Sequence, residues 1–263
     1  MKLGLLTFNM AMEWDRDEII DKCLELGFEG VEFRTQREHA HGVEIDLSAA
    51  ERASVRKQFE DGGLAICGLS TGIAFDAIDP DELAANISEA RAHLDLAADL
   101  GAGGVKVYGN KAHEDGGVSR DETIEQIGES LAGLANYAED LGVQVRFEMH
   151  GDFTSAEDCN RIMEIAGPGP GICLIYNCNN AADVDENGSI EASSRAVAQH
   201  VEHVHVHDLA DPAFPYLELV RLLKADGYEG WATGELPDSP DRERVLQYFV
   251  ALWRAYEMIA SLE

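Results

Sequence analysis

Short apolar segments alternate with longer amphipathic segments along the whole chain. Several of the amphipathic segments close on a glycine, and an apolar strand begins within a few residues of it; these glycines are Gly27, Gly101, Gly142 and Gly227. Glycine accepts the left-handed conformation in which many helices end. The repeating unit is therefore a helix, a glycine and a strand, which is half of a β-α-β repeat.

The alternation predicts eight strands and eight helices. Strands are expected at 3–8, 29–33, 64–69, 104–108, 143–149, 171–176, 201–206 and 230–234. Helices are expected near 15–26, 48–61, 80–99, 120–140, 155–166, 189–199, 215–226 and 240–261. Eight such units predict an α/β fold, a single (β/α)8 TIM barrel that forms one domain over residues 1–263. An open doubly wound sheet is the alternative, but no Gly-x-Gly-x-x-Gly follows the first strand.

Several predicted helices begin at a residue that can cap them. Ser48, Ser119 and Ser155 each precede acidic residues at the start of an amphipathic segment. The longest irregular stretches all follow a predicted strand, and they are 34–47, 70–79, 109–119 and 177–188. Loops that follow the strands build the pocket of such a barrel.

Length and composition agree with one barrel. The chain has 263 residues and a hydrophobic fraction of 45%, and a barrel of this type needs about 250 residues. The five cysteines contain no Cys-x-x-Cys pair, which argues against a disulfide framework or a zinc site. The chain has no apolar run of the roughly 18 residues that a membrane span needs, and its first residues do not form a signal peptide. We therefore expect a soluble, cytoplasmic protein without a membrane partner.

The net charge of −30 predicts a strongly acidic surface. Acidic residues are spread over nearly every predicted helix, and the chain has 6 lysines against 14 arginines. A uniform acidic coat is typical of a halophilic protein, because the Debye length falls to about 3 Å at 1 M salt. An acidic surface for a basic partner is the less favoured alternative. The surface would repel a phosphate backbone, so no nucleic-acid partner is expected.

Polar residues gather at the ends of the predicted strands. They are Glu32 and Arg34 at the second strand, Lys106 at the fourth, Glu148 and His150 at the fifth, Asn177 and Asn180 at the sixth, His203 to Asp208 at the seventh, and Glu235 at the eighth. In a closed barrel these ends converge on one mouth, where the catalytic residues of such folds lie. The candidate site is therefore expected at that mouth.

The seventh strand carries the most specific pattern. Alternation places His203, His205 and His207 on the same side of the strand, with valines on the other side. One buried histidine is usually structural, but three in alternation before an aspartate favour a functional role for His205 or His207. His203 lies deepest in the strand and is expected to be structural.

Glu148 and Glu235 are single carboxylates at the ends of apolar strands. An unpaired buried carboxylate costs several kcal/mol, so each needs a cation, a proton or a partner. A divalent metal shared with a histidine would satisfy all of these groups. The alternative is a local basic partner for each carboxylate, and Lys106 and Arg34 are the inward candidates.

Three motifs together resemble the xylose isomerase-like TIM barrels, particularly the sugar phosphate isomerase and epimerase group. The motifs are Phe147-Glu-Met-His-Gly-Asp-Phe153, His203-Val-His-Val-His-Asp208 and Gly227-Tyr-Glu-Gly-Trp-Ala-Thr-Gly-Glu235. The resemblance implies one divalent cation, manganese or magnesium, with Glu148, His205 and Glu235 as ligands. The family places an aspartate and then a histidine on the sixth strand, where this chain has Asn177 and Asn180. Asn177 can offer an amide oxygen, which binds a hard cation more weakly than a carboxylate does.

The resemblance also implies a mechanism. The cation would polarise a substrate carbonyl and stabilise an enediolate, while Glu148 and Glu235 remove and return a proton from opposite faces. The substrate is expected to be a small sugar, sugar phosphate or related polyol. The expected substrate contacts are His150, Lys106, Asn180, His207, Asp208 and Trp14. Trp14 and the nearby Phe8 form either an apolar wall below a sugar ring or part of the core.

Other functions stay open at this point. A lyase or dehydratase on the same barrel would start with the same proton abstraction. A nuclease of abasic DNA would need further metal ligands on the second, third and sixth strands, where the chain offers Glu32, Thr71 and Asn177. A barrel that binds a sugar without converting it is the third alternative, and Asn177 and Asn180 motivate it. The sequence does not choose between phosphorylated and free substrates, and it is compatible with a homo-oligomer.

Overall fold

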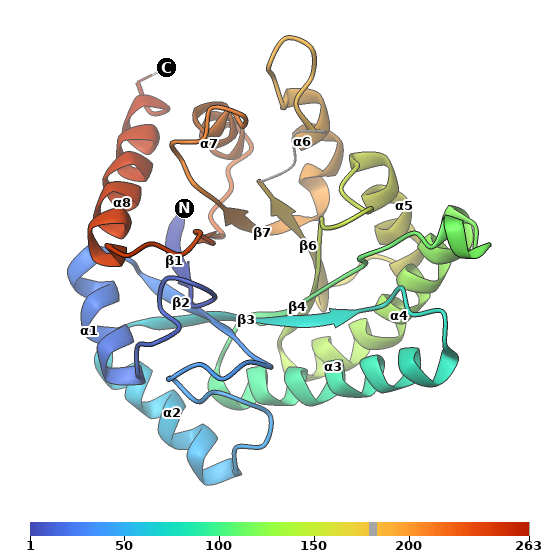
Figure 1. The fold of residues 1–263 in the computed structure, drawn as a ribbon, viewed down its shortest axis with the longest axis horizontal. Helices are drawn as coiled ribbons and strands as arrows, with labels where there is room; N and C mark the ends of the chain where they lie inside the picture. The colour runs from blue at the N-terminus through green and yellow to red at the C-terminus, as the bar shows by residue number, and fades with distance from the viewer. Residues whose placement is uncertain (179–182, 263) are drawn as a thin grey trace.

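A computed structural model of the chain describes residues 1–178 and 183–262. Eight parallel strands form a closed barrel in sequence order, and the helices surround it (Figure 1). The strands are β1 Lys2–Leu6, β2 Gly30–Arg34, β3 Ala65–Ala74, β4 Gly104–Tyr108, β5 Gln144–Glu148, β6 Ile172–Asn177, β7 Val201–Val206 and β8 Trp231–Gly234. The helices are α1 Arg16–Leu26, α2 Ala49–Gly62, α3 Pro80–Leu100, α4 Arg120–Leu141, α5 Ala156–Ala166, α6 Glu191–Val197, α7 Tyr216–Ala225 and α8 Arg242–Ile259. The predicted (β/α)8 barrel is confirmed.

The bounds of the elements agree with the prediction to within two residues, except at the end of the third strand. The third strand was expected to end at residue 69, but β3 continues to Ala74, because Ala74 pairs with Tyr108 of β4 after an irregularity in the register. The sixth helix was expected over 189–199, but α6 is shorter, and a 3-10 turn over Ala198–His200 follows it. Pairing of β1 with β8 closes the sheet and excludes the doubly wound alternative.

The predicted helix caps are present. The Ser48 and Ser119 side chains each accept the amide of the third residue of their helix, and a glutamate at that position accepts the cap amide in return. Ser155 accepts the amide of Asp158 at the start of α5. These bonds satisfy amides that lack a partner within the helix, so they stabilise the start of each of these helices.

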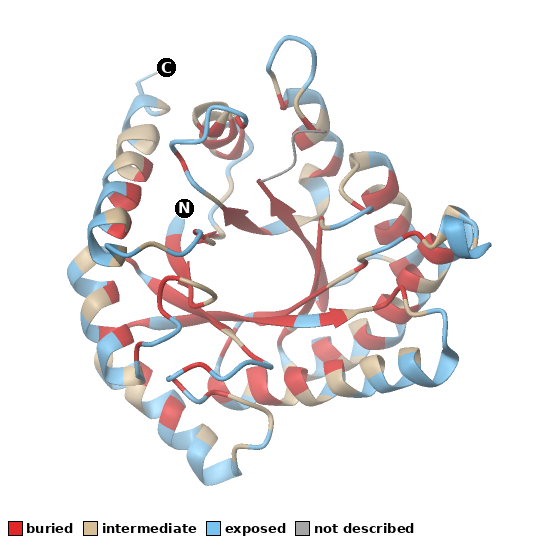
Figure 2. Ribbon diagram, in the orientation of Figure 1, coloured by how far each residue is buried: buried red, intermediate tan, exposed pale blue. Residues whose placement is uncertain are grey.

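The hydrophobic core lies between the strands and the surrounding helices. Figure 2 shows buried strands and helices whose outer faces are exposed. Val105 and Val145, on the outer face of the barrel, are fully buried, as are Leu131 and Leu134 of α4. None of the helices that the structure describes has both the length and the apolar character needed to span a bilayer.

Several polar side chains lie inside the barrel, among them Glu32, Arg146 and His203. Arg146 of β5 is 5% exposed, and glycines make room for its long side chain. A β-carbon added at Gly104 would lie 2.6 Å from Nε of Arg146 and 2.6 Å from the carbonyl oxygen of Gln144. Gly103 is equally close to the guanidinium, because its β-carbon would lie 2.5 Å from Nη2 of Arg146. The Gly103-Gly104 pair therefore allows an arginine to lie inside the barrel.

We predict that Gly104→Ala lowers the free energy of unfolding by about 1–3 kcal/mol, the usual cost of overpacking a core. Gly133→Ala is the matched control, because Gly133 lies in α4 and a β-carbon there meets nothing within 4 Å. Alanine is the better helix former, so this control should raise stability by about 1 kcal/mol. Equilibrium unfolding in denaturant measures both effects. Equal effects of the two changes would contradict the packing argument.

Candidate active site at the barrel mouth

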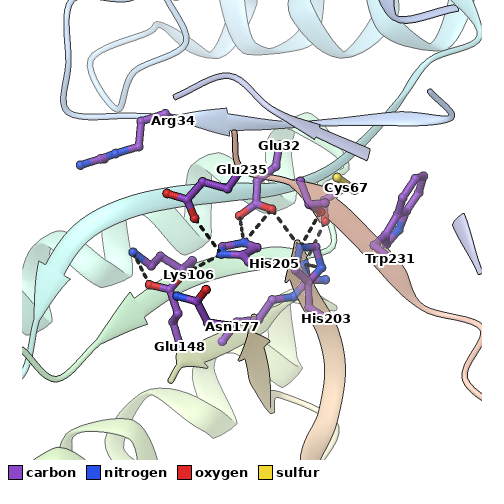
Figure 3. A network of polar contacts seen from close by, with 12 residues as sticks. Glu32, Arg34, Cys67, Lys106, Glu148, Asn177, His203, His205, Trp231 and Glu235 are labelled. Atoms are coloured by element: carbon purple, nitrogen blue, oxygen red, sulfur yellow. Dashed lines mark hydrogen bonds and ion pairs between the residues drawn. The ribbon is translucent and has the colours of Figure 1, made fainter. Parts of the chain in front are cut away.

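Three side chains from different strands meet at the C-terminal mouth of the barrel. Glu148 ends β5, His205 lies in β7, and Glu235 directly follows β8. Nδ1 of His205 lies 2.6 Å from Oε1 of Glu148 and 3.6 Å from Oε2 of Glu235 (Figure 3). Glu148 and His205 are buried, whereas 22% of the Glu235 side chain is exposed. The structure therefore brings together the two predicted carboxylates and one histidine, which we call the carboxylate–histidine cluster.

Lys106 and His150 lie beside this cluster. Nζ of Lys106 is 2.7 Å from Oε2 of Glu148 and 4.2 Å from the ring centroid of Tyr108. The ring of His150 packs against Tyr108, with 4.6 Å between centroids. The basic partner considered from the sequence is thus present for Glu148, and it is Lys106.

The sixth-strand asparagine lies next to the cluster. Asn177 is paired in register with His205 across β6 and β7, and it is buried. Its Oδ1 lies 2.6 Å from Nε2 of His207. An amide oxygen only accepts, so His207 donates this hydrogen bond. Nε2 of His207 also lies 4.0 Å from Oε2 of Glu235. Asn177 and His207 therefore border the cluster as a hydrogen-bonded pair.

The structure does not bring the other predicted residues to the cluster. Trp14 is 5% exposed in the hydrophobic core, and the ammonium of Lys22 in α1 lies 4.6 Å from its ring centroid. Asp208 is exposed and accepts the amide of Ala210 in the turn after β7. Asn180 lies outside the described residues. The side chains of Trp14 and Asp208 make no contact with the cluster in the part of the chain that the structure describes.

Glu32 is a polar strand end to which the sequence pattern assigned no role in the site. It is 1% exposed, and its Oε2 lies 2.9 Å from Nε2 of His203 and 3.2 Å from Nε2 of His205. The Glu32 carboxylate thus contacts Nε2 of His205, the ring nitrogen that faces away from Glu148. The sequence placed Glu32 at the end of the second strand, but only the closed sheet shows that its carboxylate meets His203 and His205 of β7.

Arg146 fixes the hydrogen bonding of His203. Its Nη1 lies 3.0 Å from Nδ1 of His203 and also donates to the carbonyl of Cys67. Burial lowers the pKa of His203 to about 4, so the ring is neutral. A neutral ring that accepts at Nδ1 donates at Nε2, which is the nitrogen facing Glu32. The structural role predicted for His203 agrees with this arrangement.

The pKa values of the cluster carboxyls are displaced in opposite directions. Burial favours a higher pKa for Glu148, but Lys106 and His205 outweigh it and hold that pKa well below its usual range. Burial and the nearby Glu148 charge raise the pKa of Glu235. Burial disfavours the charged form of His205, but the Glu32 and Glu148 carboxylates raise its pKa to about 10. The cluster therefore contains one ionised glutamate and one that holds a proton more readily.

The cluster has a donor set that fits a divalent cation. Glu148, His205 and Glu235 each offer one ligand atom, and these atoms lie within 4.8 Å of one another. Carboxylate and imidazole ligands suit Mn²⁺ and related ions. A second set of possible ligand atoms within 4.8 Å of one another comes from Glu32, His203 and His205. The guanidinium of Arg146 beside His203 disfavours a cation there, because it already supplies positive charge.

The closed (β/α)8 barrel places the chain in the class of TIM-barrel proteins, with carboxylates and histidines at the C-terminal mouth. The model of one family, described as the xylose isomerase-like TIM barrel, matches residues 20–256. The chain belongs to this family, as the motifs indicated.

Solved structures with this fold include several sugar epimerases. The 3-keto-D-glucoside 4-epimerase from E. coli has a TM-score of 0.78 and 17% identity, covering 97% of this chain and 99% of that one. A D-psicose 3-epimerase has a TM-score of 0.79 and 18% identity, with 98% and 99% covered. An L-ribulose 3-epimerase has a TM-score of 0.79 and 16% identity, with 99% and 96% covered. At these identities the likeness shows the fold. None of the curated proteins compared by sequence matches the chain.

We predict that Glu32→Ala lowers the free energy of unfolding by about 3–5 kcal/mol, because it leaves buried histidines without their acceptor. Glu25→Ala is the control, since Glu25 is an exposed carboxylate on α1, and its effect should stay within about 0.5 kcal/mol. Equilibrium unfolding monitored by circular dichroism measures both. A loss for Glu32→Ala no larger than that of the control would show that the buried contacts of Glu32 do not stabilise the barrel.

Proposed function

We propose that the protein is a divalent-metal-dependent isomerase or epimerase of a sugar or related hydroxy-ketone. The observation that carries the proposal is the pair of glutamates at one imidazole nitrogen, with pKa values displaced in opposite directions. Moving a proton next to a carbonyl requires one group that accepts it and another that returns it. The sugar epimerases with the same fold support the proposed substrate class.

Glu148 and Glu235 are the proposed acid–base pair. Glu148 stays ionised beside Lys106 and is therefore the better candidate to take a proton from the carbon next to the substrate carbonyl. Glu235 has the raised pKa and the more exposed side chain, so it can hold a proton and deliver it to the substrate. Because Glu148 is buried, its hydrogen bonds to Lys106 and His205 rather than water set its orientation.

We assign the metal site to Glu148, His205 and Glu235, with Asn177 as the neutral fourth ligand. A bound divalent cation supplies Lewis-acid stabilisation of the negative charge that develops on a substrate oxygen. The amide oxygen of Asn177 already accepts from His207, so this ligand contributes less than an aspartate would. Lys106 and His150 are the proposed partners of substrate hydroxyls, since both lie at the edge of the cluster beside Tyr108.

The Asn177–His207 pair also motivates a second candidate, a barrel that binds a sugar without converting it. An engaged neutral amide in place of a carboxylate weakens the metal site. A lyase or dehydratase is the third candidate, because it shares the first proton abstraction. Proton exchange separates the binding barrel from the two enzymes, and loss of water from the product separates a dehydratase from an isomerase.

We predict that Glu235→Gln reduces the affinity for Mn²⁺ at least about tenfold, because an amide oxygen binds a hard cation more weakly than the carboxylate that Glu235 offers when it releases its proton. Asn177→Asp should raise the affinity, since it adds the missing charge. Titration calorimetry and metal analysis after dialysis measure both. Glu25→Gln removes an equal charge on α1 and serves as the control. Unchanged metal content in Glu235→Gln would refute the assignment.

We further predict that the protein exchanges the proton next to the carbonyl of a ketose with solvent deuterium. Glu148→Gln should slow this exchange by a factor of about 10²–10⁴, the usual contribution of a general base. Nuclear magnetic resonance of D-fructose and related ketoses in deuterium oxide measures the rate. Sugar binding that persists in a chelator, with no exchange in any ketose, would favour the non-catalytic barrel instead.

A further inference from the structure

Among the described residues, two arginines at the rim of the mouth have no carboxylate partner. Acidic residues outnumber basic ones 50 to 20 in this chain, and other arginines such as Arg120 and Arg254 form ion pairs. Arg34 and Arg37 form none within 4.0 Å of a carboxylate in the described ranges. Both guanidiniums lie near the ring of Phe8 instead, with Cζ 5.6 Å and 5.1 Å from its centroid. The described residues therefore leave two positive charges without an ion pair at the mouth, although the chain has a large excess of acidic residues that could neutralise them.

The nearest acidic residues are engaged elsewhere. Glu44 lies in the loop before α2, and its two carboxylate oxygens accept the backbone amides of Gln36 and Arg37 at 2.9 Å and 3.2 Å. Glu235 is within electrostatic range of Arg34, but it contacts the histidines of the cluster. Each acid thus has another role, and the guanidiniums keep their charge available.

Arg34 extends the column of inward-facing residues on β2. It follows Glu32 by two residues, so alternation directs it to the same side, roughly 7 Å closer to the mouth. Nη1 of Arg34 donates to the carbonyls of Thr35 and Ser70, which fixes the side chain. A β-carbon at Gly72 would lie 3.2 Å from Nη2, so this glycine keeps that edge of the guanidinium clear. Arg34 is drawn with the site residues in Figure 3, and Glu235 is within electrostatic range of it.

We propose that Arg34 and Arg37, together with the Phe8 ring, form a subsite for an anionic group of the substrate, either a carboxylate or a phosphate. The inference rests on the proposed function, because it extends the substrate from a hydroxy-ketone to a hydroxy-ketone that carries a negative charge. A planar guanidinium donates two parallel hydrogen bonds to such a group. The acidic surface repels anions in general. An anionic substrate group is therefore attracted only where the two arginines lie, at the mouth.

Binding measurements at low ionic strength test the subsite. The probes are D-fructose, D-fructose 6-phosphate and 2-keto-D-gluconate, which are neutral, phosphorylated and carboxylated ketoses. Titration calorimetry should show that one anionic probe binds at least about tenfold more tightly than D-fructose, and which one does so identifies the anion. Arg34→Gln should reduce this ratio by about 10- to 100-fold, the effect of losing a hydrogen bond to a charged group.

Three further variants separate charge recognition from a structural role. Arg34→Lys keeps the charge but loses the planar fork, so it should restore part of the ratio. Arg37→Gln changes an exposed side chain and should lower the ratio even if Arg34→Gln unfolds the loop. Arg91→Gln is the matched control, because Arg91 on α3 likewise lies over an aromatic ring, that of Tyr137, and donates to a carbonyl. The ratio should not change in this control.

The outcomes distinguish the subsite from the proposed function. Equal affinity for neutral and anionic probes, or a ratio that falls equally in Arg91→Gln, would overturn the subsite. Proton exchange on D-fructose without any preference for an anion would do the same and would leave the proposed isomerase in place. Selective anion binding that depends on Arg34, without proton exchange in any probe, would support the subsite and refute the isomerase.

Discussion

A carboxylate inside a barrel needs a positively charged or hydrogen-bonding partner, and Glu32 shows how this constraint organises the interior. Its oxygens face the Nε2 atoms of His203 and His205, and Arg146 lies on the other side of His203. Because Glu32 orients one nitrogen of His205, the other nitrogen faces Glu148. The geometry of the candidate site therefore depends on a carboxylate below it.

Charge alternates along the barrel axis from this level to the mouth. Contacts lead from the positive Arg146 through the neutral His203 to Glu32, then to the His205 ring, and then to Glu148 and Glu235. Each charged layer offsets the desolvation cost of the next, which an isolated buried charge cannot do. Glycines contribute to this arrangement, since Gly103 and Gly104 leave the space that Arg146 fills.

The same alternation relates the proposed chemistry to the proposed substrate class. Glu148 and Glu235 experience different surroundings, one beside Lys106 and the other partly exposed, so their pKa values diverge. At the rim the order of charge ends in Arg34, whose neighbouring carboxylates Glu44 and Glu235 form no ion pair with it among the described residues. A negatively charged substrate group would continue the series.

The alternation of strands and helices, repeated eight times, and the glycines that end several helices were sufficient to predict the barrel, because both are local patterns. They also placed Glu148, His205 and Glu235 at one mouth, since parallel strand ends converge in any closed barrel. Only the tertiary structure decided which groups meet inside. Glu32 joins the cluster, and Trp14 joins the core, because contacts across the barrel depend on register and closure. Those properties are set by packing over the whole sheet and leave no local pattern in the sequence.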